Sequence, residues 1–221
     1  MNVDLPRIPR VIHQIWIPNW KSSPKDIRES RAKWCELNPD WDYQFWDEQR
    51  IESLLISHFQ GPIYELWTSL GKEYIIKKAD LARLVIAYRH GGIYADMDLI
   101  PMRPLTVNEK SPIRSMVCVP ELGFPESHHR VANGFFGCLP RQDFIFEFIL
   151  KSVDRAFGPV LDFLGPKRFG EAIWQHYTIE KDVQFLPYDL FLSVNPTENA
   201  YIRNMQIRSW GDHSKARWWK V

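Results

Sequence analysis

Cysteine is scarce in this chain. Its 221 residues contain three cysteines, namely Cys35, Cys118 and Cys138. Because their number is odd and they lie far apart, they suit neither a disulfide framework nor a clustered zinc site. A usable N-glycosylation acceptor is also lacking, since Asn195 is followed by Pro196. These absences favour a reducing compartment, and we expect a cytoplasmic protein.

Long apolar runs and an excess of one charge are lacking as well. No window approaches about 18 consecutive apolar residues, and the first ten residues, MNVDLPRIPR, carry no apolar stretch of the signal-peptide kind. We therefore expect no transmembrane segment. The formal net charge is +1, and the basic residues are scattered along the chain. This distribution provides no electrostatic footprint for nucleic acid.

The composition is that of an ordinary folded domain. Of the residues, 45% are apolar, 25% are charged and 14% are aromatic, which is enough to bury one sizeable core at this length. We predict a single globular domain over residues 1–221 and make no prediction of its oligomeric state.

Apolar patterning predicts strands alternating with helices. The clearest helix spans 77–90, with Leu81, Leu84, Val85 and Tyr88 on one buried face and Gly91 after its end. Another helix begins at Pro24, capped by Ser22 or Ser23, and ends near residue 38. Further helices are predicted over 47–57, 62–70, 142–157 and 166–177, and strands over 10–17, 43–46, 93–99, 116–119, 134–139, 183–186 and 206–210. This order predicts an α/β sheet covered by helices on both faces.

Two Asp-x-Asp triplets differ in their place on this sheet. Asp40 and Asp42 stand before a strand, whereas Asp96 and Asp98 stand where the strand 93–99 runs out. Ligands of open α/β sheets bind at the carboxyl ends of strands, so only the second pair lies at the expected edge. We predict that Asp40 and Asp42 are solvated.

The period of two along the strand 93–99 predicts how the second triplet is presented. Ile93, Ala95, Met97 and Leu99 would point to one side, and Tyr94, Asp96 and Asp98 to the other. Two carboxylates on one face can bind a hard divalent cation and leave positions for diphosphate oxygens. The alternative is a solvated strand end, which the triplet alone does not exclude.

The preceding helix carries Asp80 and Arg83, three residues apart and beside the apolar face. An ionised Asp can accept hydrogen bonds from sugar hydroxyls, and an Arg beside it can hold a carboxylate or phosphate through two parallel bonds. The alternative is an ordinary surface ion pair.

The segments IPRVIHQIW, residues 8–16, and KKADLARLVIAYRHGGIYADMDLIPMRPL, residues 77–105, together resemble the DXD-containing sugar transferases of glycosyltransferase family 32. The similarity extends through VANGFFGCLPRQDF, LGPKRFGEA and IRSWGDHSKARWW. That family includes fungal α-1,6-mannosyltransferases, animal α-1,4-galactosyl and N-acetylglucosaminyl transferases and bacterial capsular-sugar transferases. The resemblance implies a GT-A fold with a mixed, Rossmann-like central sheet flanked by helices.

The resemblance also implies roles for individual residues. Asp80 and Arg83 would contact the donor's ribose and sugar, Tyr94 would line the donor pocket, and Asp96 and Asp98 would bind Mn²⁺ or Mg²⁺ and the diphosphate. His13, Gln14 and Trp16 resemble the end that holds the nucleotide base, although Trp16 would serve equally well as a core residue. Asn133 and Gly134 resemble a turn near the reacting sugar, and Gly165-Pro166 resembles a later turn.

The C-terminal segment departs from the family pattern. Many members carry a His just before the Trp that matches Trp210, whereas this chain has Arg208 and Ser209 there. Asp212 or His213 is then the candidate third metal ligand, and His128-His129 is a weaker one. We predict that 209–221 forms a lid in which Trp210 and Lys215 close over the donor, with Gly211 as hinge. The alternative is a tail packed permanently on the core.

The resemblance implies transfer of a hexose from a UDP- or GDP-sugar to a hydroxyl of a glycan or similar acceptor, with retention of anomeric configuration. Glu121, Asp143 and Glu171 are the candidate nucleophiles for a covalent intermediate, and we favour direct attack on the leaving-group face instead. Two alternatives are a nucleotide-sugar hydrolase, which would show no acceptor dependence, and a non-catalytic sugar- or nucleotide-binding module.

Overall fold

The computed structural model describes residues 3–18, 20–121, 130–157 and 163–206. Its centre is a six-stranded sheet with the strand order β2-β1-β3-β6-β5-β7. The strands are β1 (Val11–Ile15), β2 (Asp42–Trp46), β3 (Gly92–Ala95), β5 (Met116–Pro120), β6 (Val131–Cys138) and β7 (Val183–Phe185). Within this sheet β6 runs antiparallel to both of its neighbours, and the other pairs are parallel. The mixed sheet confirms the predicted fold class.

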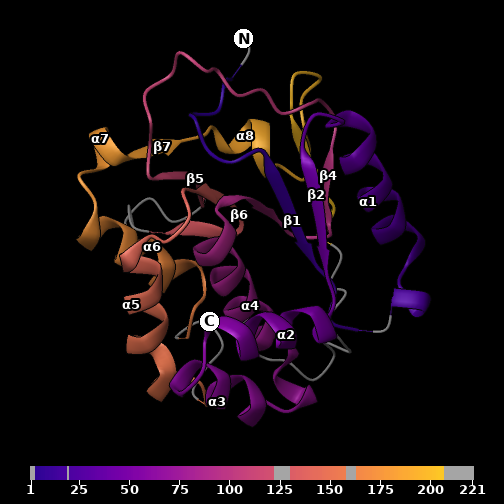
Figure 1. Ribbon diagram of the computed structural model, residues 1–221. Helices are drawn as coiled ribbons and strands as arrows, with labels where there is room; N and C mark the ends of the chain where they lie inside the picture. The colour runs from indigo at the N-terminus through magenta and orange to yellow at the C-terminus, as the bar shows by residue number, and fades with distance from the viewer. Residues whose placement is uncertain (1–2, 19, 122–129, 158–162, 207–221) are drawn as a thin grey trace.

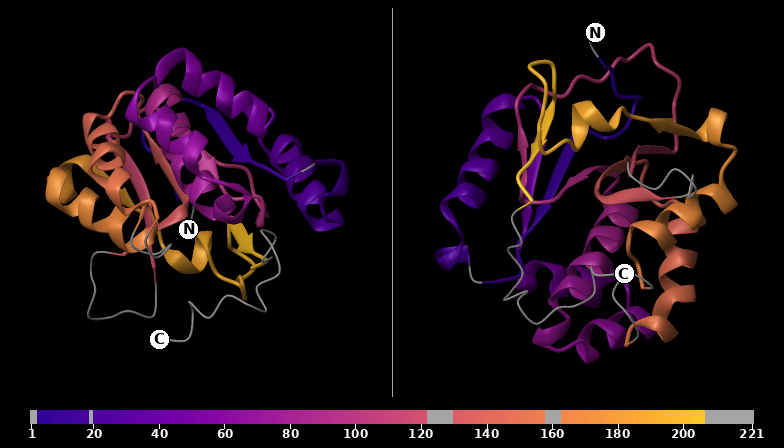
Figure 2. Two further views of the ribbon diagram at one scale, coloured as in Figure 1. Left: turned by 90° about the horizontal axis from the view of Figure 1, so that it is seen from below. Right: turned by 180° about the vertical axis from the view of Figure 1, so that it is seen from behind.

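Helices cover both faces of the sheet (Figure 1). The α-helices are α1 (Lys25–Leu37), α2 (Glu48–His58), α3 (Pro62–Ser69), α4 (Ile75–His90), α5 (Asp143–Ser152), α6 (Pro166–His176), α7 (Ile179–Asp182) and α8 (Tyr188–Phe191). Short 3-10 helices occur at η1 (Trp20–Ser22), η2 (Lys72–Tyr74) and η3 (Val153–Arg155). Both views of Figure 2 place α1 and the α5–α6 pair at opposite sides of the molecule.

Alternate strand residues divide between two apolar cores. Tyr94 and Phe136 point to the core packed with α2 to α6, whereas Ile93 and Phe135 point to the core packed with α1 and α8. This alternation follows from the period of two along a strand. The structure thus buries both faces of the sheet.

A second, two-stranded sheet pairs β4 (Leu99–Pro101) with β8 (Ile202–Asn204). The two strands are antiparallel. Trp34 of α1, which is fully buried, donates its indole N–H to the Leu99 carbonyl at 2.8 Å, and the Ser30 hydroxyl donates to the same oxygen at 2.9 Å. The segment that follows the second Asp-x-Asp triplet is therefore anchored to α1.

Several predicted elements need correction. Helix α1 begins at Lys25 with Pro24 as its N-cap and without a side-chain cap bond, so the serine cap at Ser22 or Ser23 was wrong. The helix predicted over 142–157 ends at Ser152 and continues as η3. The strand predicted over 206–210 lies almost wholly outside the described residues.

Helix α4 differs from its predicted amphipathic form. The prediction was one buried face, but the helix is buried on every side between residues 79 and 87. It lies between the sheet and the helices α2 and α5. The described helices include none that is long and apolar enough to cross a membrane. The three cysteines are free thiols.

Candidate functional site

The strand predicted over 93–99 is broken at the Asp-x-Asp triplet. β3 ends at Ala95 and β4 begins at Leu99, and the Leu99 amide donates to the Asp96 carbonyl at 3.1 Å to close a turn. The predicted alternation beyond Ala95 was therefore wrong. The turn lies at the carboxyl end of β3, beside the carboxyl end of β1, which is the edge where ligands of such sheets bind.

Neighbouring elements hold this turn through its backbone. The Asp96 amide donates to the Gly134 carbonyl at 2.8 Å, and the Met205 amide donates to the Asp98 carbonyl at 3.0 Å. From β1, the Gln14 side chain donates to the Asp96 carbonyl at 3.2 Å. Each tether comes from a different element, so the turn is preorganised by the fold.

Asp80 and Arg83 form the centre of a buried polar network. Their side chains are 5% and 6% exposed, with Arg83 Nη2 3.2 Å from Asp80 Oδ1. The same nitrogen lies 3.6 Å from Asp96 Oδ1, and Nη1 donates to the Asn133 carbonyl at 2.7 Å. The alternative of a surface ion pair is therefore wrong. Burial makes these contacts far stronger than they would be in water, provided that every charge is paired.

The network sets the charge of its members. Burial raises the pKa of Asp80 to about 6, opposed by the Arg83 guanidinium. For Arg83, burial opposes the charge, but Asp96, Tyr94, Asp80 and Asp98 outweigh it and raise the pKa further. Arg83 is thus a fixed cation facing several acidic groups, and it holds Asp96 electrostatically.

Asn133 connects this network to β6. Its amide donates to Asp80 Oδ1 at 3.0 Å and to the Leu164 carbonyl at 3.2 Å. Asn133 and Gly134 lie within β6 rather than in the turn that the resemblance implied. Gly165, by contrast, is the N-cap of α6 with Pro166 directly after it. Through its bond to Asp80, the Asn133 side-chain amide therefore fixes the acidic partner of Arg83.

The Asp96 carboxylate is held on two sides. The Tyr94 hydroxyl donates to Oδ1 at 2.6 Å, and the Arg83 guanidinium lies over the Tyr94 ring, 5.0 Å from its centroid. On the other side Oδ2 lies against Gly134, where an added Cβ would be only 2.5 Å away. Tyr94 is buried, and burial raises the pKa of its hydroxyl well above the usual range. It stays a neutral donor to Asp96.

A cleft of about 400 Å³ opens beside the turn. Asp96 and Asp98 line it together with Asn133 and Gly134, while Asp80, Arg83 and Tyr94 support these residues from behind. Its other lining residues are Leu99, Glu121, Arg130, Ala132, Tyr188, Leu192, Asn204 and Gln206. Of these, only Glu121 was a candidate from the sequence. Leu99 and Ala132 lie in segments that carry the family resemblance, and the rest come from segments with no recognisable motif.

The three candidates on the first strand are buried. His13 has Nε2 2.9 Å from the Gly91 carbonyl and accepts at Nδ1 from the Trp46 indole at 3.1 Å. Burial lowers its pKa to about 3. Trp16, 2% exposed, packs with Ile27 and Met97. These placements favour core roles for both, and Gln14 positions Asp96 as described above.

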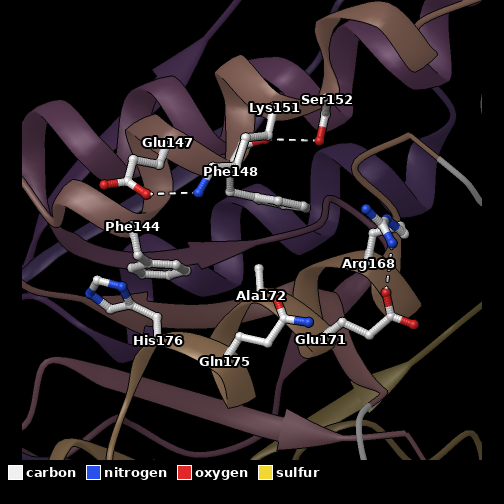
Figure 3. A pocket seen from close by; sticks show the side chains of 10 residues that line it. All are labelled: Phe144, Glu147, Phe148, Lys151, Ser152, Arg168, Glu171, Ala172, Gln175 and His176. Carbon is white, nitrogen blue, oxygen red and sulfur yellow. Dashed lines mark hydrogen bonds and ion pairs between the residues drawn. The ribbon is translucent and has the colours of Figure 1, made fainter.

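The remaining candidates from the sequence do not line the cleft in the part of the chain that the structure describes. Asp40 and Asp42 are exposed, as predicted. Asp143 is exposed at the first turn of α5, and Glu171 lines a different hollow between α5 and α6 that shares no residue with the cleft (Figure 3). The predicted roles of Trp210, Asp212, His213, Lys215 and His128-His129 lie outside the described residues. Among the described residues no three His, Cys, Asp or Glu side chains form a metal-binding group.

Comparison with known proteins finds a family match that includes part of this site. Residues 24–117 match the family described as "Glycosyltransferase sugar-binding region containing DXD motif", and this match contains α4 and the turn at Asp96. The matched region is that of the DXD-containing glycosyltransferases.

Similar glycosyltransferases come from several sources. An uncharacterized glycosyltransferase of Acanthamoeba polyphaga mimivirus is 28% identical, over 94% of this chain and 86% of its own length. Inositol phosphoceramide mannosyltransferase 1 of Schizosaccharomyces pombe is 25% identical over 66% of this chain, but this covers only 43% of the yeast protein. Human alpha-1,4-N-acetylglucosaminyltransferase is 28% identical over 45% of the chain and 26% of its own length.

Solved structures show the same fold. The PaToxG glycosyltransferase superposes with a TM-score of 0.61 and 21% identity, over 76% of this chain and 69% of that one. The UDP-bound glycosyltransferase domain of the YGT toxin gives a TM-score of 0.59 at 9% identity, over 89% and 82% of the two chains. These likenesses confirm the GT-A fold.

Proposed function

We propose that this glycosyltransferase moves a hexose from a UDP- or GDP-sugar to a hydroxyl of a glycan or similar acceptor, in a metal-dependent reaction that retains the anomeric configuration. The observation that carries the proposal is the preorganised pair Asp96 and Asp98. Both line the cleft at the carboxyl end of β3, and Asp96 is held by Tyr94 and Arg83.

The carboxylate pair fits a divalent cation such as Mn²⁺ or Mg²⁺. Tyr94 and Arg83 contact Asp96 Oδ1, and both Asp96 and Asp98 line the cleft. Two protein carboxylates suffice when diphosphate oxygens and water complete the shell. Such an ion would neutralise the diphosphate and stabilise the charge that develops on it as the sugar leaves. Asp212 or His213 stays the proposed third protein ligand.

Asp80, Arg83 and Asn133 support this pair. Because Arg83 contacts Asp80, Asp96 and the Asn133 carbonyl together, it links α4, the turn and β6 at one point. We propose that Asp80 and Arg83 contact the nucleotide-sugar donor through the small part of each side chain that is exposed. Their second task is to keep Asp96 in place before the donor binds, which lowers the cost of reaching the transition state.

The arrangement of carboxylates favours direct attack over a covalent intermediate. Of the three candidate nucleophiles, Asp143 and Glu171 lie away from the cleft. Glu121 does line it, but one of its oxygens is bound by Arg130 at 2.7 Å. In the proposed route the acceptor hydroxyl attacks from the leaving-group side, and its proton passes to the departing diphosphate. The new bond then has the configuration of the old one.

The relatives support the donor class. One solved neighbour is a UDP-bound domain, and the yeast relative is named as a mannosyltransferase. We therefore propose a nucleoside diphosphate hexose and leave uridine and guanosine as the two bases to test.

A donor panel with matched variants tests the proposal. The protein is incubated with UDP-glucose, UDP-galactose, UDP-N-acetylglucosamine or GDP-mannose, with and without methyl α-D-hexopyranosides, and in Mn²⁺, Mg²⁺ or EDTA. We expect metal-dependent release of nucleotide that increases with acceptor, and a product of retained configuration by NMR. Asp98→Asn should abolish most of this activity, whereas Asp40→Asn, in the exposed triplet, should not change it.

Every other outcome contradicts one part of the proposed function. Release that no acceptor stimulates would indicate a hydrolase, and donor binding without release would indicate a binding module. Full activity in EDTA, or equal behaviour of the two variants, would refute the metal site. An inverted product would refute the proposed route of attack.

A further inference from the structure

The cleft that Asp96 and Asp98 line also carries a carboxylate clamped by an arginine. Glu121 follows β5 and Arg130 precedes β6, and their backbones continue the pairing of the two strands, with the Glu121 amide donating to the Arg130 carbonyl at 3.1 Å. Arg130 Nε donates to Glu121 Oε2 at 2.7 Å. The side chains of Arg130 and Glu121 are only 19% and 25% exposed, so this partly buried pair is fixed in place.

Arg130 contacts only one of the two carboxylate oxygens of Glu121 in the bonds that the structure shows. Oε1 accepts no hydrogen bond from any residue in the described ranges, although the carboxylate lines the cleft. The Glu121 side chain is 25% exposed, so Oε1 can accept a charge-assisted hydrogen bond from a hydroxyl of a bound molecule. The oxygen is therefore a preorganised acceptor for one hydroxyl group.

The position of Glu121 separates it from the diphosphate end of the cleft. Arg130, its backbone partner, lies four residues before Gly134 on one extended segment, and Gly134 contacts Asp96. At about 3.4 Å per residue, these two positions are about 14 Å apart along the strand. A sugar ring fits between them, so Glu121 does not belong to the proposed metal site.

The surrounding residues suit a polyhydroxyl ring. Tyr188 and Leu192 supply an aromatic and an apolar surface to the same cleft as Glu121, and Asn204 and Gln206 supply side-chain amides. A flat apolar surface flanked by fixed hydrogen-bonding groups is the pattern that recognises a sugar, which has apolar ring faces and a rim of hydroxyls.

From this arrangement we infer that Glu121 and its neighbours form the acceptor subsite, which takes a polyhydroxyl ring such as a sugar or a cyclitol. Glu121 Oε1 accepts a hydrogen bond from a hydroxyl of the acceptor and so orients the ring for attack, while Arg130 fixes the carboxylate. The inference rests on the proposed function. It adds a site that the Asp-x-Asp motif does not contain.

Glu121→Gln tests the subsite because it keeps the shape of the side chain and removes its charge. The assay uses the donor and the methyl α-D-hexopyranoside that the wild-type enzyme uses best. Losing one charge-assisted hydrogen bond should lower kcat/KM for the acceptor by about 10- to 100-fold. The KM for the donor and the rate of donor hydrolysis without acceptor should stay at wild-type values. Glu147→Gln, which removes an exposed carboxylate paired with Lys151 on α5, is the matched control and should change none of them.

Three results would overturn the inference. Equal losses in transfer and in hydrolysis would place Glu121 at the donor, and no loss in either would show that it touches no substrate. Formation of a glycosyl azide by Glu121→Ala in azide would identify Glu121 as a nucleophile. Melting temperatures of all variants exclude misfolding as the cause.

A binding measurement keeps this test separate from the proposed function. Saturation-transfer NMR detects methyl α-D-hexopyranosides bound to the protein in the presence of UDP and Mg²⁺, without turnover. A signal that is strong for wild type and Glu147→Gln but lost in Glu121→Gln supports the subsite even if the donor assay fails. Equal signals in all three proteins, or none in any of them, would refute it.

Discussion

Gly134→Ala probes the position of a single carboxylate. An ideal Cβ at residue 134 would lie 2.5 Å from Asp96 Oδ2, whereas ordinary contact begins at 3.4 Å. The backbone of Gly134 has no positive φ, so the alanine fits the strand and the conflict is with the carboxylate. Asp96 must then move by about 1 Å, which is enough to break its hydrogen bond from Tyr94.

The size of the effect follows from that bond. The Tyr94 hydroxyl lies 2.6 Å from Asp96 Oδ1, and a hydrogen bond to a charged group contributes about 1.5–3 kcal/mol. If the bond and the carboxylate position are both needed in the transition state, kcat/KM should fall roughly 10- to 100-fold. The free energy of unfolding should fall by no more than about 3 kcal/mol, because one buried hydroxyl loses its partner.

Gly71→Ala provides a matched control. There an added Cβ would also lie 2.5 Å from a carboxylate oxygen, Oε2 of Glu73, but Glu73 is exposed and can turn into solvent. We expect unchanged kcat/KM for Gly71→Ala. Steady-state kinetics at saturating metal, together with thermal melts, make the comparison. Wild-type kcat/KM in a folded Gly134→Ala protein would refute the claim that the position of Asp96 matters.

Four further predictions follow from the same site. Arg83→Lys should lower kcat/KM at least about 10-fold, because a point charge cannot bridge three partners, whereas Arg89→Lys should not. Gln14→Leu should lower kcat yet leave the preference between uridine and guanosine donors unchanged, and a changed preference would show that Gln14 contacts the base. Burial raises the pKa of Asp80 to about 6, so between pH 4 and 6 the native protein binds a proton that the unfolded protein releases. The melting temperature of wild type relative to Asp80→Asn should therefore fall from pH 4 to pH 6 and then level off. A rise over this range would show that the pKa of Asp80 is lowered and not raised. Truncation after Ser209 should abolish transfer and leave the domain folded, and nucleotide with Mn²⁺ should slow proteolysis of this tail. Equal rates of proteolysis with and without nucleotide would contradict the proposed lid.

The sequence alone predicted most of the elements and the location of the candidate site. Helix and strand periods, with Gly and Pro as boundaries, predicted most elements of the sheet and its helices, because these signals act between residues close in the chain. The carboxyl-edge rule selected Asp96 and Asp98 over Asp40 and Asp42, which are exposed as predicted. Glu121 entered the argument only as one of three carboxylates of unknown place.

Only the tertiary structure decided what these residues contact. Asp80 and Arg83 have the spacing of a surface ion pair, yet α4 is covered on all sides, and burial makes the same pair the centre of a network. The strand through Asp96 breaks because Gln14, Gly134 and Met205 hold its backbone from segments far apart in the chain. Such contacts leave no periodic trace in the sequence, since each depends on how the strands are ordered and not on local spacing. For the same reason the shared lining of the cleft could not be predicted. Its residues come from the ends of β5 and β6, from α8, and from β8 and the segment after it, namely Glu121, Arg130, Tyr188, Asn204 and Gln206.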